Sequence, residues 1–333
     1  MPKRYFCMDL HISVIADFKS LGLDVEVVDW CMSGHAFVMN RPQDTPNHIN
    51  AKTWQQLNPE MIAAFQKEYD TFLSGFDGFV VGYASSFAMV FEKYGKPIVL
   101  MNAVRFDMPF CWTGDMGMRA KYLECLQRLK CEDRLIAVSN NKGDQEYMRR
   151  AGVDSHYIPS LCLYTKMKYN PIRPTFLFYT GSCQHDRRVT QRHELGGNFA
   201  WQTVAEFKGT IHTPYDISTM SLFEQFSAGC PMFFPSKKFL LEKPENLITL
   251  SAYWGDRPIP AEYGDMSKTA AWIELADFYE AFQSPNTYYY DSFSGAGTSL
   301  SSLLDSFVYV DDTAERAASI VRHQATWKAL VKV

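Results

Sequence analysis

Short apolar runs alternate with segments of helical periodicity through the first half of the chain. The runs have the length of buried strands and lie at residues 3–9, 25–30, 78–81, 97–101 and 134–138. Between them, apolar side chains recur at helical spacing, most clearly over residues 58–73, and a polar helix is predicted at 142–151. Buried strands that alternate with helices are typical of a parallel sheet covered on both faces.

The second half of the chain repeats this pattern. Strands are predicted at 175–180, 209–212, 231–235 and 287–290, and helices at 221–228, 269–282 and 312–330. Residues 163–174 contain Pro171 and Pro174 and show no period, which is typical of a linker. Residues 242–268, rich in proline, glycine and aromatic side chains, are predicted to form a long surface loop.

These patterns predict an α/β protein of two Rossmann-like, doubly wound domains that face each other across a cleft. The first domain would comprise residues 1–162 and the second 175–311. A final helix is predicted at 312–333.

The composition of the chain argues against several classes of function. The 333 residues are 47% hydrophobic and 21% charged, with a net charge of −4, so no basic field favours nucleic acid or an anionic membrane. No uncharged apolar stretch approaches the ~20 residues of a membrane span, and the N-terminus does not resemble a secretory signal. The eight cysteines form no Cys-x-x-Cys pair, which favours free thiols over disulfides or zinc. We therefore expect a cytoplasmic protein.

Residues 209–236 hold the most informative pattern, a strand, a polar turn, a helix and a second strand. Ser218, Thr219 and Ser221 lie at the predicted helix N-terminus, where unpaired N–H groups and the helix dipole favour a bound anion such as a diphosphate. Glu224, in the first turns of that helix, could reach the hydroxyl pair of a ribose. A simple cap with Glu224 as the capping-box partner of Ser221 explains the same spacing, and both interpretations stay open here.

Asp216-x7-Glu224 followed by FSAGCPMFFPS resembles the donor-site signature of GT-B glycosyltransferases. The resemblance implies that Glu224 binds the ribose of a nucleotide sugar and that Asp216 contacts the transferred sugar. It implies a diphosphate cradle made of Ser218, Thr219, Met220 and Ser221, with Tyr215 beside it. Residues 134–160 likewise resemble the end of the N-terminal GT-B domain. The resemblance also implies that the final helix at 312–333 crosses back to the first domain.

The loop after strand 175–180 often supplies basic residues to the donor phosphates in this family. Gly181, Arg187 and Arg188 lie in that region here, followed by Arg192. The resemblance therefore adds Gly181, Arg187 and Arg188 to the donor site. A solvated helix face is the alternative explanation of this arginine cluster.

Candidates for the acceptor side follow the strands of the first half. Asp9 and His11 come directly after the first strand, at the edge where doubly wound sheets bind ligands, and a histidine there could act as general base on a hydroxyl. His35, Ser85 and Arg105 follow the next strands. The alternative is that Asp9 or Ser13 caps a helix and that His11 is a surface residue.

Together these features predict a glycosyltransferase that moves a sugar from a UDP- or GDP-linked donor to a hydroxyl of a glycan or small-molecule acceptor. No metal or other cofactor is expected to be obligatory, because a helix N-terminus with arginine can neutralise the diphosphate and no Asp-x-Asp pair is present. His11 or Asp9 would be the base if transfer inverts the anomeric centre, and Asp216 would assist if it retains it. A non-catalytic two-lobed nucleotide- or sugar-binding protein and a UDP-sugar epimerase remain alternatives.

Overall fold

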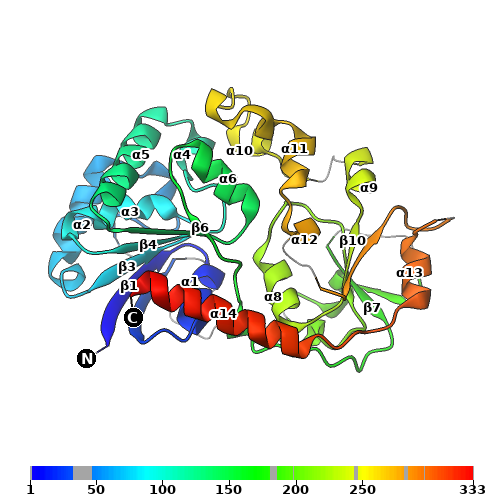
Figure 1. Ribbon diagram of the computed structural model, residues 1–333. Coiled ribbons are helices and arrows are strands. Elements are labelled where there is room, and N and C mark those ends of the chain that lie inside the picture. The colour runs from blue at the N-terminus through cyan, green and yellow to red at the C-terminus, as the bar shows by residue number, and fades with distance from the viewer. Residues whose placement is uncertain are drawn as a thin grey trace. The chain divides into compact units, whose positions relative to one another are not determined.

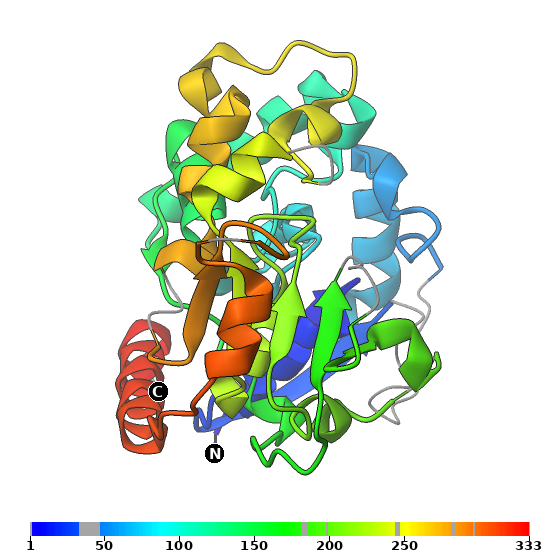
Figure 2. The ribbon, with the colours of Figure 1, turned by 90° about the vertical axis from the view of Figure 1, so that its right-hand side faces the viewer.

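The computed structural model describes residues 2–32, 47–180, 186–197, 199–243, 247–280, 284–295 and 297–332. The chain forms two compact units. Unit 1 comprises Met1–Pro159, Ser251–Gly264 and His323–Val333, and unit 2 comprises Ser160–Leu250 and Asp265–Arg322. Each unit contains one parallel sheet flanked by helices (Figures 1 and 2). The expectation of an α/β protein with two parallel sheets is confirmed.

The sheet of unit 1 has six strands in the order β2-β1-β3-β4-β5-β6. Their bounds are β1 Lys3–Asp9, β2 Val25–Cys31, β3 Gly78–Val81, β4 Ile98–Asn102, β5 Leu135–Ser139 and β6 His156–Tyr157. All neighbouring pairs are parallel. The strand order reverses between β1 and β3, which lie side by side. Ligands of doubly wound sheets bind at the carboxyl edge of such a reversal.

Helices cover both faces of this sheet. They are α1 Ile12–Ser20, α2 Pro59–Leu73, α3 Ala88–Phe91, α4 Phe110–Thr113, α5 Met116–Cys131 and α6 Lys142–Arg150, with 3-10 turns η2 Trp54–Gln56, η3 Ser85–Phe87 and η4 Glu92–Tyr94. Asn58 caps α2 by accepting a hydrogen bond from the Met61 N–H, and Pro59 occupies the first turn. Figure 1 shows α2, α3 and α5 on one face and α1 on the other, as right-handed crossovers require.

The last part of the chain completes the α1 face. Helix α14 spans Thr313–Val331, and its residues from His323 onward belong to unit 1. The Trp327 indole is 2% exposed and meets the Phe18 ring of α1 edge-on, with 6.1 Å between the ring centroids. The Lys3 ammonium also donates a hydrogen bond to the Lys332 carbonyl. Unit 1 therefore depends on residues from both ends of the chain.

A second distant segment, Ser251–Gly264, also belongs to unit 1. The sequence predicted a surface loop here, and that prediction is wrong. Helix α10 spans Leu250–Trp254, η8 spans Ala261–Ser267, and Tyr253, Trp254 and Tyr263 are buried. These aromatic side chains do not lie along one face of a single helix, so the sequence shows no periodicity that would predict their burial.

The sheet of unit 2 has five parallel strands in the order β11-β10-β9-β7-β8. Their bounds are β7 Phe176–Thr180, β8 Val189–Gln191, β9 Thr210–His212, β10 Met232–Pro235 and β11 Thr287–Tyr290. Alternate residues of β7 enter different clusters, Phe176 and Phe178 on one face and Leu177 on the other. The strand order reverses between β7 and β9, so this sheet too has one reversal point.

Helices and 3-10 turns surround this sheet. They are η5 Leu163–Thr165, η6 Arg192–Leu195, α7 Trp201–Val204, α8 Met220–Ala228, α9 Lys237–Glu242, α11 Thr269–Glu274, α12 Asp277–Glu280 and α13 Leu300–Ser306. The helix predicted at 269–282 is thus two shorter helices. The segment 163–174, predicted as a linker, packs on unit 2, because the Tyr169 N–H donates to the Ala228 carbonyl and Met167 is buried in a core cluster. Among the described residues, no helix has the length and apolarity to cross a membrane.

The Trp327 contact predicts how strongly unit 1 depends on α14. Trp327→Ala should lower the free energy of unfolding by about 3–5 kcal/mol, because it removes a large buried ring and leaves a cavity beside Phe18. Val321→Ala, on the same helix at a side chain 64% exposed, should change it by less than about 0.5 kcal/mol. Denaturant unfolding of both variants measures the difference. Equal effects would show that α14 does not stabilise unit 1 through Trp327.

Candidate functional site

The strand reversal of unit 2 brings the ends of β7 and β9 together. Thr180, the last residue of β7, and His212, the last residue of β9, approach each other through Oγ1 and Nδ1 at 3.3 Å. Helix α8 follows β9 after a turn at residues 213–219. The site predicted from residues 215–224 therefore lies at the sheet edge where ligands of such folds bind.

His212 fixes α8 relative to this edge. Its Nε2 lies 3.0 Å from Gln225 Oε1 of α8 and 3.2 Å from Thr210 Oγ1, and its ring stacks on Phe234. Burial lowers the pKa of His212 to about 3, against a smaller opposing effect of the Gln225 hydrogen bond. The ring is therefore neutral at physiological pH, and its role is to hold β9 and α8 together.

The start of α8 differs from a simple capped helix. Thr219 is the N-cap residue with extended backbone, but its side chain makes no capping hydrogen bond, and its Oγ1 lies 3.0 Å from Ser221 Oγ. Glu224 is only 7% exposed, and its Oε1 accepts a hydrogen bond of 2.5 Å from the Tyr164 hydroxyl. Ser221 is the second residue of α8 and not its N-cap, so it does not form the capping box with Glu224 that the spacing left open.

Tyr179 and Arg192 extend this group of polar side chains. The Arg192 guanidinium lies 4.6 Å above the Tyr179 ring, and a side-chain hydrogen bond links Tyr179 to Ser221. Burial, reinforced by the negative charge of Glu224 and opposed by Arg192, raises the pKa of Tyr179 to about 12. The Tyr179 phenol therefore stays neutral at physiological pH.

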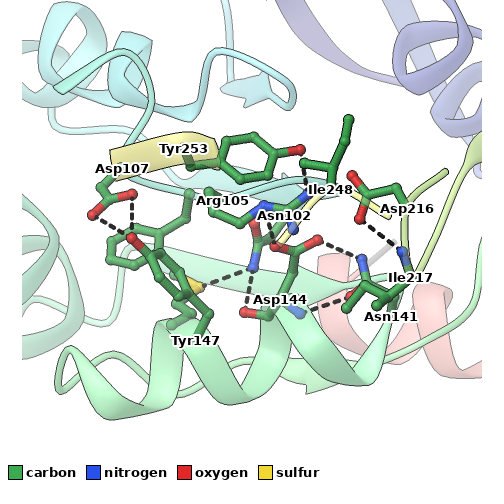
Figure 3. A network of polar contacts seen from close by, with 12 residues as sticks. Asn102, Arg105, Asp107, Asn141, Asp144, Tyr147, Asp216, Ile217, Ile248 and Tyr253 are labelled. Carbon is green, nitrogen blue, oxygen red and sulfur yellow. Dashed lines mark hydrogen bonds and ion pairs between the residues drawn. The ribbon is translucent and has the colours of Figure 1, made fainter. Parts of the chain in front are cut away.

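The turn before α8 holds the remaining donor-side residues. Asp216 is buried, and its Oδ1 accepts a hydrogen bond of 2.7 Å from the Ile217 N–H, a contact drawn in Figure 3. Tyr215 is half-exposed, and burial together with the neighbouring Asp216 raises its pKa, against the opposing charge of Arg192. Ser218 is half-buried in the same turn, and Met220 begins the helix.

The arginines of the predicted cluster lie in different surroundings. Arg188 is engaged by carboxylates, with 2.6 Å from its Nη2 to Asp186 Oδ2 and a second ion pair to Asp305. Arg187 is exposed, whereas Arg192 lies with Tyr179. Gly181 lies outside the described residues. Of the three arginines, Arg192 is thus the one that contacts Tyr179, the phenol whose pKa Glu224 and Ser221 also influence.

Asp9 occupies the strand reversal of unit 1. Its side chain is 1% exposed and accepts three backbone hydrogen bonds, from Leu10 and Ala84 to Oδ1 and from Tyr83 to Oδ2, at 2.8–3.0 Å. Gly82 permits this approach, since a Cβ there would lie 2.6 Å from Asp9 Oδ2. Burial raises the pKa of Asp9 to about 6, although the backbone N–H groups oppose the shift. Asp9 therefore joins the turns after β1 and β3.

His11 caps helix α1 from the same turn. Its Nδ1 accepts a hydrogen bond of 3.3 Å from the Ser13 N–H, and its ring stacks on Tyr83 with 5.8 Å between centroids. With Nδ1 as the acceptor, the neutral ring carries its proton on Nε2. In this arrangement Nε2 is a hydrogen-bond donor, so accepting a proton there would require the ring or its Ser13 contact to change.

The other acceptor-side candidates are enclosed within unit 1. Ser85 is fully buried and donates its hydroxyl hydrogen to the Phe106 carbonyl. Arg105 is 2% exposed; its Nε lies 3.3 Å from Asp144 Oδ1, and its guanidinium packs 4.0 Å from the Tyr253 ring centre and bonds to the Tyr253 hydroxyl (Figure 3). His35 lies outside the described residues.

A second buried group beside Arg105 holds the segment 251–264 in place. Asp107 accepts hydrogen bonds from Arg119 Nε at 2.7 Å and from the Tyr147 hydroxyl at 3.1 Å. Arg119 in turn donates to the Tyr263 hydroxyl, and the Tyr147 and Tyr263 rings stack at 4.0 Å. The carboxyl edge at β4 and β5 is therefore filled by side chains of the chain itself. Within the described ranges, no group of three His, Cys, Asp or Glu side chains is arranged to hold a metal ion.

Sequence reasoning missed Tyr164 and Tyr179 as neighbours of Glu224. Tyr164 falls in a stretch without periodicity, and nothing in its sequence context marks it. Tyr179 is the next-to-last residue of a strand that was correctly expected, so its place at the carboxyl edge of β7 was accessible from the sequence.

Comparisons with known proteins give only distant likenesses. No protein-family model matches the chain, and no curated protein matches its sequence. Among solved structures, the chain is similar to the glycotransferase of kitacinnamycin, with 9% identity, a TM-score of 0.39 and coverage of 99% of this chain and 96% of that one. It is also similar to the glycosyltransferase SnogD from Streptomyces nogalater, with 9% identity, a TM-score of 0.40 and coverage of 86% and 97%. Identities and TM-scores this low assign no function to the chain.

The buried His212 predicts a specific dependence of stability on pH. Its pKa is about 3 in the folded state and 6.5 in the unfolded chain, so between these values only the unfolded chain binds the proton. The free energy of unfolding should therefore fall as the pH is lowered, by about 2 kcal/mol from this group between pH 7 and pH 5. Denaturant unfolding of the parent and of His212→Gln at both pH values isolates the contribution. If both proteins lose the same stability, His212 is not buried as a neutral ring.

Proposed function

We propose that the protein is a glycosyltransferase that uses a nucleotide diphosphate sugar as donor and a hydroxyl compound as acceptor. One observation carries the proposal: the nearly buried Glu224 carboxylate lies in the first turns of α8, beside Tyr164, Tyr179 and Arg192, at the strand reversal of unit 2. The acidic-x7-Glu segment that resembles GT-B enzymes thus lies at the carboxyl edge of the sheet, where doubly wound folds bind ligands.

The chemistry of this group suits a ribose and a diphosphate. A carboxylate accepts hydrogen bonds from two adjacent hydroxyls at once, and such charge-assisted bonds are strong. The N-terminal residues of α8, Thr219, Met220 and Ser221, would direct N–H groups and the positive end of the helix dipole at phosphate oxygens. Arg192 would add the full positive charge, since Arg188 already pairs with Asp186 and Asp305.

The transfer step follows from this placement. As the bond between the anomeric carbon and the diphosphate breaks, negative charge grows on the leaving phosphate oxygen, and the α8 N-terminus with Arg192 would stabilise it. Such an arrangement neutralises the leaving group without a metal ion. Asp216 would contact the transferred sugar from the turn before α8. The acceptor hydroxyl attacks the anomeric carbon, and its proton passes to His11 in an inverting transfer or to the departing phosphate oxygen in a retaining one.

The acceptor side is assigned to unit 1. Asp9, with both carboxylate oxygens engaged by backbone N–H groups, would position the turn that carries His11 and would not itself touch the acceptor. His11 would contact the acceptor hydroxyl through Nε2, and it can serve as base only after its Nδ1 gives up the Ser13 N–H. An inverting reaction needs that change, whereas a retaining one leaves His11 as a hydrogen-bond donor.

Glu224→Ala tests the donor assignment. Losing the carboxylate should weaken the binding of UDP or GDP at least about tenfold, because hydrogen bonds to a charged group contribute about 1.5–3 kcal/mol. Calorimetric titration measures the change. Glu206→Ala, which removes a half-buried carboxylate of the same unit that pairs with Arg173, should leave affinity unchanged. Unchanged affinity in a folded Glu224→Ala protein would exclude the ribose role. Tight binding with no release of nucleotide diphosphate from any nucleotide sugar tested would favour a non-catalytic binding protein.

The arginines give a separate prediction. Arg192→Ala should weaken the binding of UDP or GDP while leaving that of the corresponding nucleoside unchanged, because only the diphosphate meets the guanidinium. Arg188→Ala should instead lower thermal stability, since its ion pairs to Asp186 and Asp305 and its bond to Ser301 are internal to unit 2. Titration and thermal unfolding of both variants distinguish the roles. The reverse pattern would assign the phosphates to Arg188.

A further inference from the structure

Tyr164 lies in a turn that the backbone alone does not favour. The chain enters unit 2 at Ser160, and η5 follows at Leu163–Thr165. The residues on both sides of η5, Cys162 and Lys166, have left-handed backbone with φ of 49° and 53°. Side chains with a Cβ are unfavourable in that region, so the turn depends on contacts with the rest of unit 2 to keep its shape.

Those contacts go to α8. The Tyr164 hydroxyl donates to Glu224 Oε1 at 2.5 Å, and the Cys162 thiol lies 4.0 Å from the Met220 carbonyl oxygen at the start of the helix. The Tyr164 ring also meets Trp201 edge-on, with 5.4 Å between centroids. The turn is thus attached to α8 at its first residue and at the carboxylate proposed to bind the donor.

We infer that Tyr164 is a positioning residue that orients the Glu224 carboxylate toward the ribose hydroxyl pair of the donor. This inference rests on the proposed function. The terminal torsion of a glutamate has broad minima, so an isolated carboxylate samples many orientations. A phenol that donates to one oxygen fixes the plane of the group, and the Trp201 contact holds the phenol ring in turn.

The hydrogen bond from Tyr164 uses one acceptor position of the Glu224 carboxylate. Each carboxylate oxygen offers two acceptor positions, so Glu224 Oε1 can accept from Tyr164 and from a sugar hydroxyl together. Tyr164 thereby determines where both hydroxyls must lie. Ribose is then distinguished from 2′-deoxyribose by a preset geometry. Because Tyr164 belongs to the segment through which the chain enters unit 2, donor binding also stabilises that turn.

The test compares each ribonucleotide with its 2′-deoxy counterpart, which lacks one hydroxyl of the pair. The probes are UDP, GDP and ADP with dUDP, dGDP and dADP, and the measured quantity is the ratio of ribo to deoxy affinity by titration calorimetry. The variant is Tyr164→Phe. The matched control is Tyr169→Phe in the same segment, whose hydroxyl donates to the Lys208 carbonyl at 2.8 Å and not to Glu224.

Tyr164→Phe should reduce the ribo-to-deoxy ratio about threefold to tenfold, as expected for losing one hydrogen bond that orients a charged group. Tyr169→Phe should keep the parental ratio, and Glu224→Ala should bring it close to one. A variant that is merely less stable loses affinity for both sugars alike and keeps the ratio.

The outcomes separate the inference from the function on which it rests. If Tyr164→Phe keeps the ribo-to-deoxy affinity ratio of the parent while Glu224→Ala brings it close to one, Tyr164 does not position the carboxylate. The assignment of Glu224 to the donor would then still stand. A parental ratio in Glu224→Ala would overturn the ribose assignment itself. If the parent binds none of the probes, the proposed function fails, and the role of Tyr164 fails with it.

Discussion

Two consecutive side chains on α8 point to different partners, and the arrangement of unit 2 depends on both. Gln225 bonds to the neutral ring of His212 at the end of β9, while Glu224 bonds to Tyr164 in the segment that enters the unit. A one-residue step on a helix turns the side chain by roughly 100°. The helix therefore joins the sheet edge and the entering segment, and its N-terminus is held in place between them.

Different buried groups occupy the strand reversals of the two sheets. The ends of parallel strands leave backbone groups that need partners. In unit 1, the buried Asp9 carboxylate accepts hydrogen bonds from three such N–H groups. Its burial raises the pKa of Asp9 to about 6. Unit 2 places the uncharged His212 at the corresponding point, with a pKa lowered to about 3.

Most strands were predictable because they are short, largely apolar runs, and β1, β3 and β11 begin and end where the pattern placed them. Strand β8, Val189–Gln191, is short and mostly polar, and it was not predicted. Helix α5 was not predicted, although its buried apolar side chains recur at helical spacing. Arg119 lies on the same face and is buried because Asp107 and Tyr263 surround it. Partners so distant along the chain leave no local pattern. The same holds for the site: the spacing of Asp216 and Glu224 was visible in the sequence, whereas the contact of Glu224 with Tyr164 spans 60 residues.

Unit 1 is assembled from three separate pieces of the chain, and this affects how the protein is made. Its sheet is complete once β6 has been synthesised, yet Tyr253 and Tyr263 must still reach Arg105 and Arg119, and Trp327 must reach Phe18. On the ribosome, on the order of ten seconds or more separates the first piece from the last. During that interval the apolar surface beneath Trp327 is open to water and to other chains. A nascent unit 1 therefore exposes an apolar surface to aggregation or to chaperones until Trp327 has been synthesised.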